Sequence, residues 1–342
     1  MAYKKITVEE HFSTPEHLEK LWDIFKKKYP DAKVVEEEKY IDSDIPFIPS
    51  LNKPYMAQFF NKLYDIGTKR LESMDRSNID LQVLSLISPG VQVFETKTAI
   101  KLARSLNDKL STAVQKNPAR FAGLASIAPQ EPDEAADELV RAVKDLGLKG
   151  AVINSHTKGE YLDDPKYWVI FEQAEKLNVP IYLHPRAPSP DMIKPYLGYP
   201  MLHSAMLGFG AETGLHAMRL MCSGVFDKFP GLKIILGHMG EALPFWLWRL
   251  DRIWKSPLVK KREKTPSEYL KDNFFISTSG MYSKRALKYT IEMMGADNIL
   301  FACDYPMDSS KEGVQFINET KIEDSDKEKI FHLNAEKLFF QN

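Results

Sequence analysis

Residues 180–184 read Pro-Ile-Tyr-Leu-His, a short apolar run that ends on a histidine. A strand buried on both faces of a parallel sheet has this composition, because neither face meets water. Helical periodicity precedes the run over 165–177, where Pro165 is a favourable first helical residue. The helix and the buried strand together predict one repeating unit of an α/β fold.

Seven other runs along the chain have the same character, and stretches of helical periodicity separate them. The helices predicted over 97–117 and 132–146 end near Pro118 and Gly147, which are typical helix stops. Eight alternations of strand and helix predict a single closed (β/α)₈ TIM barrel of the α/β class. The eight predicted strands are 5–10, 80–87, 121–127, 149–154, 180–184, 233–238, 273–278 and 298–303.

Two segments are longer than a minimal βα unit: 13–75 after the first strand and 186–230 after the fifth. Long loops in these positions of a barrel form the wall of the active site or a contact between subunits. The apolar stripe of the helical run 56–75 indicates a core or interface helix. No linker divides the chain, so we expect one domain over 1–342 with these two insertions.

The composition is that of a folded globular protein: 342 residues, of which 44% are hydrophobic and 27% are charged. The net charge is only -1, and no basic run is interleaved with aromatic residues, so nucleic acid is not an expected partner. No apolar stretch is long enough to span a membrane. The polar start of the chain and its two cysteines, Cys222 and Cys303, predict a soluble, cytoplasmic protein.

Glu9 and His11 are the first candidate site residues. They are separated by one residue on a predicted strand, so the pleat directs both side chains to the same side. Near the carboxyl end of a barrel strand, that side faces the axis where this fold keeps its reactive groups. A glutamate and a histidine that converge there can share a metal ion, although the pair alone is a weak signal.

Three other predicted strands end in residues that can bind a metal or exchange a proton. His184, His238 and Asp304 end, or directly follow, the fifth, sixth and eighth predicted strands. The carboxyl ends of barrel strands meet at one mouth, so these side chains are expected to lie near the glutamate and histidine of the first strand. The pattern predicts a single reactive centre.

The remaining histidines have no predicted catalytic role. Cys303 precedes Asp304 and, by strand alternation, points to the opposite face, so we expect it in the core. The histidines set aside are His17 and His332, in helical and polar surroundings, His156, in the loop after the fourth strand, and His203 and His216, in the 186–230 insertion.

The segments that contain these residues resemble the amidohydrolase superfamily. Within it they are similar to the metal-dependent, non-oxidative decarboxylases of γ-resorcylate (2,6-dihydroxybenzoate), 5-carboxyvanillate and aminocarboxymuconate semialdehyde. The resemblance is closest to the γ-resorcylate group, whose first strand reads Glu-x-His where the superfamily more often has His-x-His. It covers most of the chain, through Val8-Glu9-Glu10-His11-Phe12, Tyr182-Leu183-His184-Pro185-Arg186, Gly237-His238-Met239-Gly240-Glu241 with Trp248-Arg249, and Asp304-Tyr305-Pro306.

The resemblance implies that Glu9, His11, His184 and Asp304 bind one divalent metal ion. Two carboxylates and two imidazoles suit Zn²⁺ or Mn²⁺, and this ligand chemistry does not choose between the two. Superfamily members with two metals have a bridging lysine or glutamate at the end of the fourth strand, where this chain has Asn154. One metal is therefore expected.

The resemblance also implies that His238 and Glu241 form an acid/base pair beside the metal. They are three residues apart, which allows Glu241 to orient the imidazole and to raise its basicity. Loss of CO₂ from an aromatic ring requires proton delivery to the carbon that carries the carboxylate. The proton donor is Asp304 or a group served by His238 and Glu241, and we favour Asp304 as both ligand and acid.

The expected substrate is a small aromatic carboxylic acid. The decarboxylases that the chain resembles contact it through an arginine at the position of Arg249, and a guanidinium fork suits a carboxylate. Asn154 is a second candidate because it ends a strand, and Arg186 is a weaker one, for which a surface or helix-capping role competes. The family's habit and the long insertion predict a homodimer or homotetramer.

Two other functions remain open at this point. A metal-dependent hydrolase or lactonase could use the same ligands to activate water, with His238 or Asp304 as base. A barrel with a purely structural metal is less favoured, because structural sites are usually closed and rich in cysteine. CO₂ release from hydroxybenzoates, compared with hydrolysis of an aromatic lactone, separates the first two.

Overall fold

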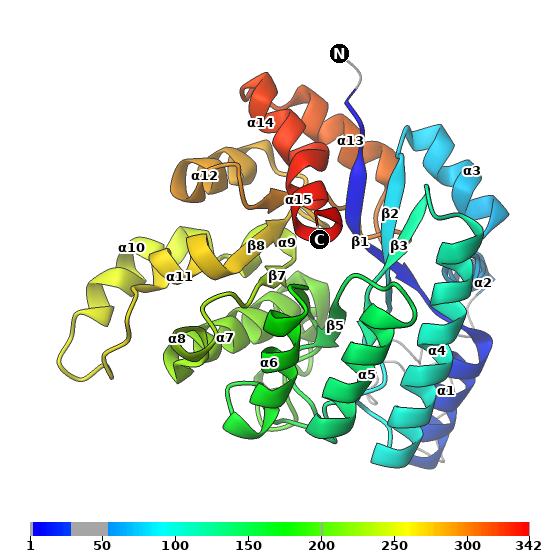
Figure 1. The fold of residues 1–342 in the computed structure, drawn as a ribbon, viewed down its shortest axis with the longest axis horizontal. Helices are drawn as coiled ribbons and strands as arrows, with labels where there is room; N and C mark the ends of the chain where they lie inside the picture. Colours follow the sequence, from blue (N-terminus) through cyan, green and yellow to red (C-terminus); the bar gives the residue numbers. More distant parts are fainter. Residues whose placement is uncertain (1–2, 29–53, 200, 342) are drawn as a thin grey trace.

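The computed structural model describes residues 3–28, 54–199 and 201–341, which form an α/β fold of parallel strands (Figure 1). Within these residues the strands make two sheets, in the orders β1-β2-β3 and β4-β5-β6-β7-β8-β9, and every neighbouring pair is parallel. The strands are β1 (Ile6–Phe12), β2 (Leu81–Leu86), β3 (Phe121–Gly123), β4 (Ala125–Ser126), β5 (Ala151–Asn154), β6 (Ile181–His184), β7 (Ile234–Leu236), β8 (Phe274–Ser277) and β9 (Ile299–Leu300).

Helices surround the strands on the outside (Figure 1). The first half of the described chain contains α1 (Pro15–Lys28), α2 (Pro54–Tyr64), α3 (Thr68–Ser77), α4 (Thr96–Lys116), α5 (Pro132–Lys144), η3 (Pro165–Tyr167) and α6 (Trp168–Lys176). The second half contains η4 (Lys194–Tyr196), η5 (Leu202–Met206), α7 (Gly208–Ser223), α8 (Val225–Lys228), α9 (His238–Glu241), α10 (Leu243–Trp254), α11 (Pro266–Asn273), α12 (Lys284–Met294), α13 (Ser310–Glu319), α14 (Asp324–Glu328), η6 (Lys329–Leu333) and α15 (Asn334–Phe340). Within the described ranges, no helix is both long and apolar enough to cross a membrane.

Each of the eight predicted strands overlaps a strand of the structure, although β1 extends two residues beyond the predicted end, and the third is divided in two. Its residues pass from one sheet to the other at Leu124, which donates its N–H to the carbonyl of Leu84 at 2.8 Å. The next residue, Ala125, donates to the carbonyl of Gly150, also at 2.8 Å. A single extended run thus joins the two sheets through its backbone.

A second set of backbone hydrogen bonds links β1 to the chain around and after β9. Val8 donates to the carbonyl of Phe301 at 3.1 Å, and His11 donates to that of Tyr305 at 2.7 Å. Between these two bonds, Asp304 donates to the carbonyl of Glu9 at 3.0 Å. The first and last strands of the chain therefore lie side by side, and Asp304 is brought against β1.

The core has two parts. The larger cluster packs the outer faces of the strands against helices such as α4, α5 and α6. The smaller cluster contains buried residues from every strand except β4, together with Leu124 just before β4, and α15 covers it with Ala335 and Phe339. Its members include Ile6, Val8, Leu81, Val83, Ala122, Leu124, Val152, Tyr182, Ile235, Phe275 and Leu300. Apolar side chains that converge from so many strands fill the interior of a sheet that curves around them.

A β-bulge in β1 decides which side chains of this strand face inward. The pairing with β2 shifts between Thr7 and Glu10, so that Val8 and Glu9 together oppose one residue of β2. Val8 packs in the smaller core cluster, and Glu9, the next residue, also reaches Tyr182 of that cluster. Without the bulge, strict alternation from Val8 would turn Glu9 away from the interior.

The predicted helix over 56–75 is wrong in one respect, because the structure has two helices there, α2 and α3. The chain breaks between them at 65–67, where the Asp65 carboxylate accepts the N–H of Gly67 at 2.8 Å. A local side-chain acceptor of this kind competes with helical backbone bonding. The part of the first insertion at 29–53 lies outside the described residues.

The second predicted insertion, 186–230, is anchored to the loop after β5 by buried polar groups. Glu212 of α7 accepts hydrogen bonds from the Ser155 hydroxyl, the Tyr161 hydroxyl and the Ser189 N–H, each at 3.2 Å. His216, one turn further along α7, accepts the N–H of Leu162 at 2.9 Å. These bonds hold the loops after β5 and β6 against α7, at the end of the strands where the site lies.

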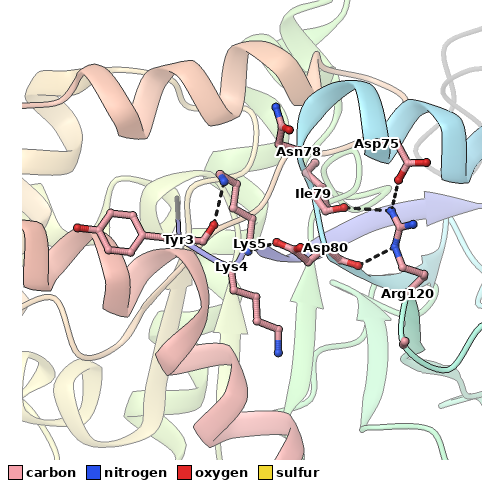
Figure 2. A pocket seen from close by; sticks show the side chains of 9 residues that line it. Tyr3, Lys4, Lys5, Asp75, Asn78, Ile79, Asp80 and Arg120 are labelled. Carbon is pink, nitrogen blue, oxygen red and sulfur yellow. Dashed lines mark hydrogen bonds and ion pairs between the residues drawn. The ribbon is translucent and has the colours of Figure 1, made fainter. Parts of the chain in front are cut away.

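A hollow at the opposite, amino ends of β1 and β2 is lined by charged residues, as Figure 2 shows. Asp80 accepts the backbone N–H of Lys5 at 2.7 Å, and Arg120 forms an ion pair with Asp75 at 2.7 Å (Figure 2). The bond between Asp80 and the backbone of Lys5 ties the starts of β1 and β2 together, and Asp75 and Arg120 neutralise each other's charge.

Candidate metal centre

Glu9 lies at the centre of the candidate site and is 1% exposed. Its Oε2 atom accepts hydrogen bonds from the hydroxyl of Tyr182 and, at 3.0 Å, from that of Ser277. Its Oε1 atom faces His184 Nε2 at 3.3 Å. Burial alone would raise the pKa of Glu9, but the positive charge of His238 holds this pKa below its usual range. The carboxylate is thus held in place through Oε2, and Oε1 is left to face the other donor atoms of the site.

His184 ends β6 and is held by Asn154, which ends the neighbouring strand β5. The Nδ1 atom of His184 lies 3.0 Å from Asn154 Oδ1, which accepts a hydrogen bond from it. This bond assigns the proton to Nδ1 and leaves the lone pair of Nε2 facing Glu9. Burial lowers the pKa of His184, which favours the neutral, metal-binding form.

His11 and Asp304 meet on the other side of Glu9. His11 Nε2 lies 3.1 Å from Asp304 Oδ1, while His11 Nδ1 lies 3.3 Å from the hydroxyl of Ser85. Asp304 has a left-handed backbone with φ 62°. Burial by itself raises the pKa of Asp304, but the neighbouring imidazoles of His11 and His238 lower it below the usual value.

The donor atoms form two overlapping groups that could each hold a metal ion. Glu9, His11 and His184 make one, Glu9, His238 and Asp304 make the other, and within each group the donor atoms lie within 4.8 Å of one another. Among the described residues, Glu9 Oε1 and His11 Nε2 are buried and have no hydrogen-bond partner. Buried polar atoms without a partner are costly, and a cation between them would satisfy both. The residues therefore fit a divalent ion of the Zn²⁺ or Mn²⁺ type.

His238 and Glu241 lie beside this cluster and contact each other. His238 Nδ1 is 2.9 Å from Glu241 Oε1, and its Nε2 is 3.8 Å from Glu9 Oε1 and 3.7 Å from Asp304 Oδ2. Burial opposes a charged imidazole, but Glu241 and Glu9 raise the pKa of His238 well above its ordinary value. The pair can hold a proton at the edge of the cluster.

The backbone that carries His238 is strained. The predicted strand 233–238 ends earlier than expected, at Leu236, and a left-handed turn follows. Five consecutive residues have positive φ: His238, Met239, Gly240, Glu241 and Ala242. Non-glycine residues pay roughly 1–2 kcal/mol each for this conformation. Gly210 of α7 makes room for the turn, since a Cβ at that position would lie 3.1 Å from Glu241 Oε2.

The predicted substrate contacts lie in different places. Asn154 is buried against His184, as described above. Arg249 is exposed on α10, and within the described chain it forms no hydrogen bond or ion pair with the cluster. Arg186 is fully buried and donates to the carbonyl of His156 at 2.9 Å, so a surface role for it is wrong. Its guanidinium thus points into the protein, toward the loop after β5.

Two side chains that support Glu9 were missed in the sequence. Tyr182 is two residues before His184, so strand alternation places both on one face, and this spacing was a usable signal. Ser277 ends β8, a strand to which no site residue had been assigned. Both donate to the same oxygen of Glu9, which orients its carboxylate.

The expectation for His17 was partly wrong. It lies in a helix, α1, but its ring is fully buried and its Nδ1 and Nε2 lie 2.9 Å from Ser13 Oγ and 3.0 Å from the carbonyl of Gly90. The helix turns His17 inward together with Leu21 and Phe25. Cys303 is buried in the larger core cluster, as expected.

Comparison with known proteins agrees with this geometry. The family model described as amidohydrolase matches residues 51–341. The γ-resorcylate decarboxylase of Polaromonas sp. is 38% identical, over 99% of both chains. Two solved structures are similar. The 5-carboxyvanillate decarboxylase from Sphingomonas paucimobilis has 38% sequence identity and a TM-score of 0.89, over 98% of this chain and 99% of that one. The 5-carboxyvanillate decarboxylase from Novosphingobium aromaticivorans, complexed with manganese and a hydroxy-methoxy-nitrobenzoic acid, has 36% identity and a TM-score of 0.90, over 98% of this chain and 96% of that one.

A family match over most of the chain, together with this identity over its full length, settles the class of protein. The chain belongs to the amidohydrolase family. Its similar relatives are decarboxylases of hydroxylated aromatic acids, and one of the solved structures holds manganese.

Proposed function

We propose that this chain is a metal-dependent, non-oxidative decarboxylase that releases CO₂ from a hydroxylated aromatic carboxylic acid of the dihydroxybenzoate type. The enzyme is a carboxy-lyase, as its full-length relatives are. The observation that carries the proposal is the cluster of strand-end donors around Glu9 in a chain of this family. The cofactor is one divalent metal ion, Mn²⁺ or Zn²⁺.

We assign metal binding to Glu9, His11, His184 and Asp304, and proton handling to Asp304, His238 and Glu241. When bound, the ion would neutralise negative charge on the carboxylate and the ortho oxygen of the substrate. The unpartnered Glu9 Oε1 and His11 Nε2 support this assignment. Asn154 and Arg249 remain the proposed substrate contacts.

The reaction needs a proton before the carbon–carbon bond breaks. Asp304 is the proposed donor to the ring carbon that bears the carboxylate, and this protonation interrupts the aromaticity of the ring. The bonding pair then returns to the ring as CO₂ leaves, which restores aromaticity. His238 Nε2, 3.7 Å from Asp304 Oδ2, can resupply the proton, and Glu241 holds the imidazole ring in place through Nδ1.

We further propose that the whole chain, 1–342, is one domain built on a closed (β/α)₈ barrel with insertions at 13–75 and 186–230. Two features support closure: the run through Leu124 that joins the sheets, and the hydrogen bonds from β1 to the segment after β9. The interior cluster, to which every strand except β4 contributes, supports it too. Closure would bring the strand ends that carry the site to one mouth.

We also propose a homodimer or homotetramer. Helix α10 exposes three large aromatic side chains, with Phe245 74%, Trp246 54% and Trp248 70% exposed. Exposed apolar surface of this kind on a soluble protein usually marks a contact with another molecule. Arg249 lies on the same helix. We also propose a cytoplasmic location, which the two free thiols of Cys222 and Cys303 support because free thiols suit a reducing compartment.

The test is a CO₂-release screen over hydroxybenzoates with the Mn²⁺-loaded protein, beside hydrolysis of an aromatic lactone. We expect CO₂ from at least one 2-hydroxylated or 2,6-dihydroxylated benzoate, and loss of this activity on chelation. Lactone hydrolysis without CO₂ release from any hydroxybenzoate would instead establish the hydrolase.

A pair of histidine variants separates the metal centre from general damage. His184→Ala removes a proposed ligand and is expected to lose bound metal and activity together. His332→Ala removes a histidine that pairs with Glu336 on the helical periphery, and it is expected to keep both. Full metal content and full activity in His184→Ala would show that the site is placed wrongly.

A further inference from the structure

Glu10 is a buried carboxylate that lies next to the proposed metal ligands, and the proposed mechanism does not use it. It lies between Glu9 and His11 in the sequence but on the opposite face of β1, and it is 0% exposed. Its Oε1 accepts the N–H of Cys303 at 2.9 Å, and its Oε2 accepts the N–H of Tyr305 at 3.2 Å. These two N–H groups belong to the residues on either side of Asp304.

Asp304 needs such support because its backbone is left-handed, with φ 62°. A non-glycine residue adopts this conformation at a cost of roughly 1–2 kcal/mol and keeps it only when its surroundings enforce it. The backbone of β1 supplies part of the constraint, through the Asp304 N–H bound to Glu9 and the His11 N–H bound to Tyr305. The carboxylate of Glu10 supplies the rest by holding both flanking N–H groups at once.

Glu10 is itself oriented by a buried chain of side chains. Gln82 of β2 donates through Nε2 to Glu10 Oε2 at 3.4 Å, and its Oε1 accepts from Arg70 Nη1 at 3.5 Å. The guanidinium of Arg70 lies over the ring of Tyr305, 4.7 Å from its centroid, and also donates to the carbonyl of His11. Arg70, Gln82 and Glu10 thus brace β1 and the Asp304 turn from behind.

We propose that Glu10 is a positioning residue that sets the place of the Asp304 carboxylate, and thereby the metal affinity of the site. It touches neither substrate nor metal and acts through the two backbone N–H groups beside Asp304. This inference rests on the proposed role of Asp304 as a metal ligand. The carboxylate is required because two separate oxygens accept from two separate donors.

The informative substitution is Glu10→Gln, which keeps the shape of the side chain. It replaces one acceptor oxygen with an NH₂ group that must face an N–H donor, so one flanking bond is lost. The matched control is Glu138→Gln in α5, where an equally buried carboxylate accepts from Asn107 at 2.7 Å and from Arg141 at 2.8 Å. Both variants lose a buried carboxylate, but only one of these carboxylates adjoins the Asp304 turn.

Two readouts report on the site apart from turnover: the Mn²⁺ dissociation constant, from the paramagnetic resonance of free Mn²⁺, and the visible absorption spectrum of the Co²⁺-loaded protein. We expect Glu10→Gln to weaken Mn²⁺ binding by about 10–100-fold, the usual effect of removing a support of a metal ligand, and to alter the Co²⁺ spectrum. Glu138→Gln is expected to be less stable to urea yet to keep the Mn²⁺ affinity and the spectrum of the unmodified protein.

Failure of this inference can be told apart from failure of the metal centre. If the unmodified protein and His184→Ala bind Mn²⁺ alike, the proposed centre is wrong, and the role of Glu10 falls with it. If His184→Ala loses Mn²⁺ but Glu10→Gln keeps it, with an unchanged Co²⁺ spectrum, only the positioning role is overturned.

A second variant covers the case in which Glu10→Gln does not fold. Glu10→Asp keeps both carboxyl oxygens but shortens the side chain by one methylene, so these oxygens lie further from the N–H groups of Cys303 and Tyr305. The same weakening of Mn²⁺ binding is expected. If both variants fail to fold while Glu138→Gln folds, Glu10 is a general stability residue, and this too contradicts a specific positioning role.

Discussion

The hydrogen bond from His184 Nδ1 to Asn154 Oδ1 fixes which imidazole nitrogen faces Glu9. Asn154 is itself held, since its N–H donates to Gln92 Oε1 at 2.6 Å. An outer residue that fixes the tautomer and angle of a ligand histidine contributes to metal affinity without touching the ion. Asn154 can therefore support the metal, contact the substrate as we proposed, or do both.

Two substitutions of Asn154 distinguish these roles. Asn154→Leu removes the acceptor, and if the metal role dominates it should weaken Mn²⁺ binding by about 10–100-fold. Asn154→Asp keeps an oxygen for His184 Nδ1–H and should retain most of the affinity. Titration of Mn²⁺ and the KM for the substrate are the measurements. A higher KM at unchanged Mn²⁺ affinity in Asn154→Leu would assign the residue to the substrate alone.

Among the elements, the turn that carries His238 and Glu241 combines strain with function. Its consecutive left-handed residues aim the imidazole at Glu9 and Asp304 and keep Glu241 within 2.9 Å of His238 Nδ1. Gly280, on the loop after β8, completes the fit, because a Cβ there would lie 3.0 Å from His238 Cδ2. Strain of this kind persists where the surrounding structure enforces it, and it is concentrated at functional sites.

The strain at Ala242 can be released without removing a side chain of the site. Ala242 has φ 63°, and Ala242→Gly should remove its penalty at the cost of a more flexible unfolded chain. The expected net gain in the free energy of unfolding is about 0.5–1 kcal/mol. Urea denaturation measures it. A loss of stability would mean that the methyl group of Ala242 contributes more through packing than its backbone conformation costs.

In the molecule as a whole, several histidines are buried as neutral rings outside the metal cluster. Burial lowers the pKa of His17 to about 4, that of His216 to about 3, and that of His156 to about 2. In the unfolded chain each returns to an ordinary value near 6.5. Below that pH the unfolded state binds protons that the folded state does not, so stability falls as the pH is lowered.

This linkage predicts acid sensitivity between pH 6.5 and pH 4. The free energy of unfolding should fall over this range, and His17→Gln, which can still reach Ser13 and Gly90, should fall less steeply. The difference in slope is expected to approach about 1.4 kcal/mol per pH unit, the value for one proton. Urea denaturation at a series of pH values measures both slopes. Equal slopes for the two proteins would show that His17 is not kept neutral by folding.

Much of the fold and the candidate site could be read from local patterns. Each predicted strand overlaps a strand of the structure, because runs such as 180–184 have the apolar composition of buried strands. The residues predicted for the metal were found at strand ends, and the structure brings their donor atoms together. The break between α2 and α3 was missed, because it depends on one side-chain bond from Asp65.

The sequence by itself determined which residues can serve the chemistry, because a histidine or carboxylate after a buried strand is visible as a local pattern. Only the tertiary structure decided how they are aimed. The bulge lets the neighbours Val8 and Glu9 both face inward, which strict alternation starting from Val8 would not allow. Glu10 faces the other way and accepts the N–H groups of Cys303 and Tyr305, almost three hundred residues later in the chain. Register and such distant hydrogen bonds arise between strands, so no single stretch of sequence contains the interactions that fix them.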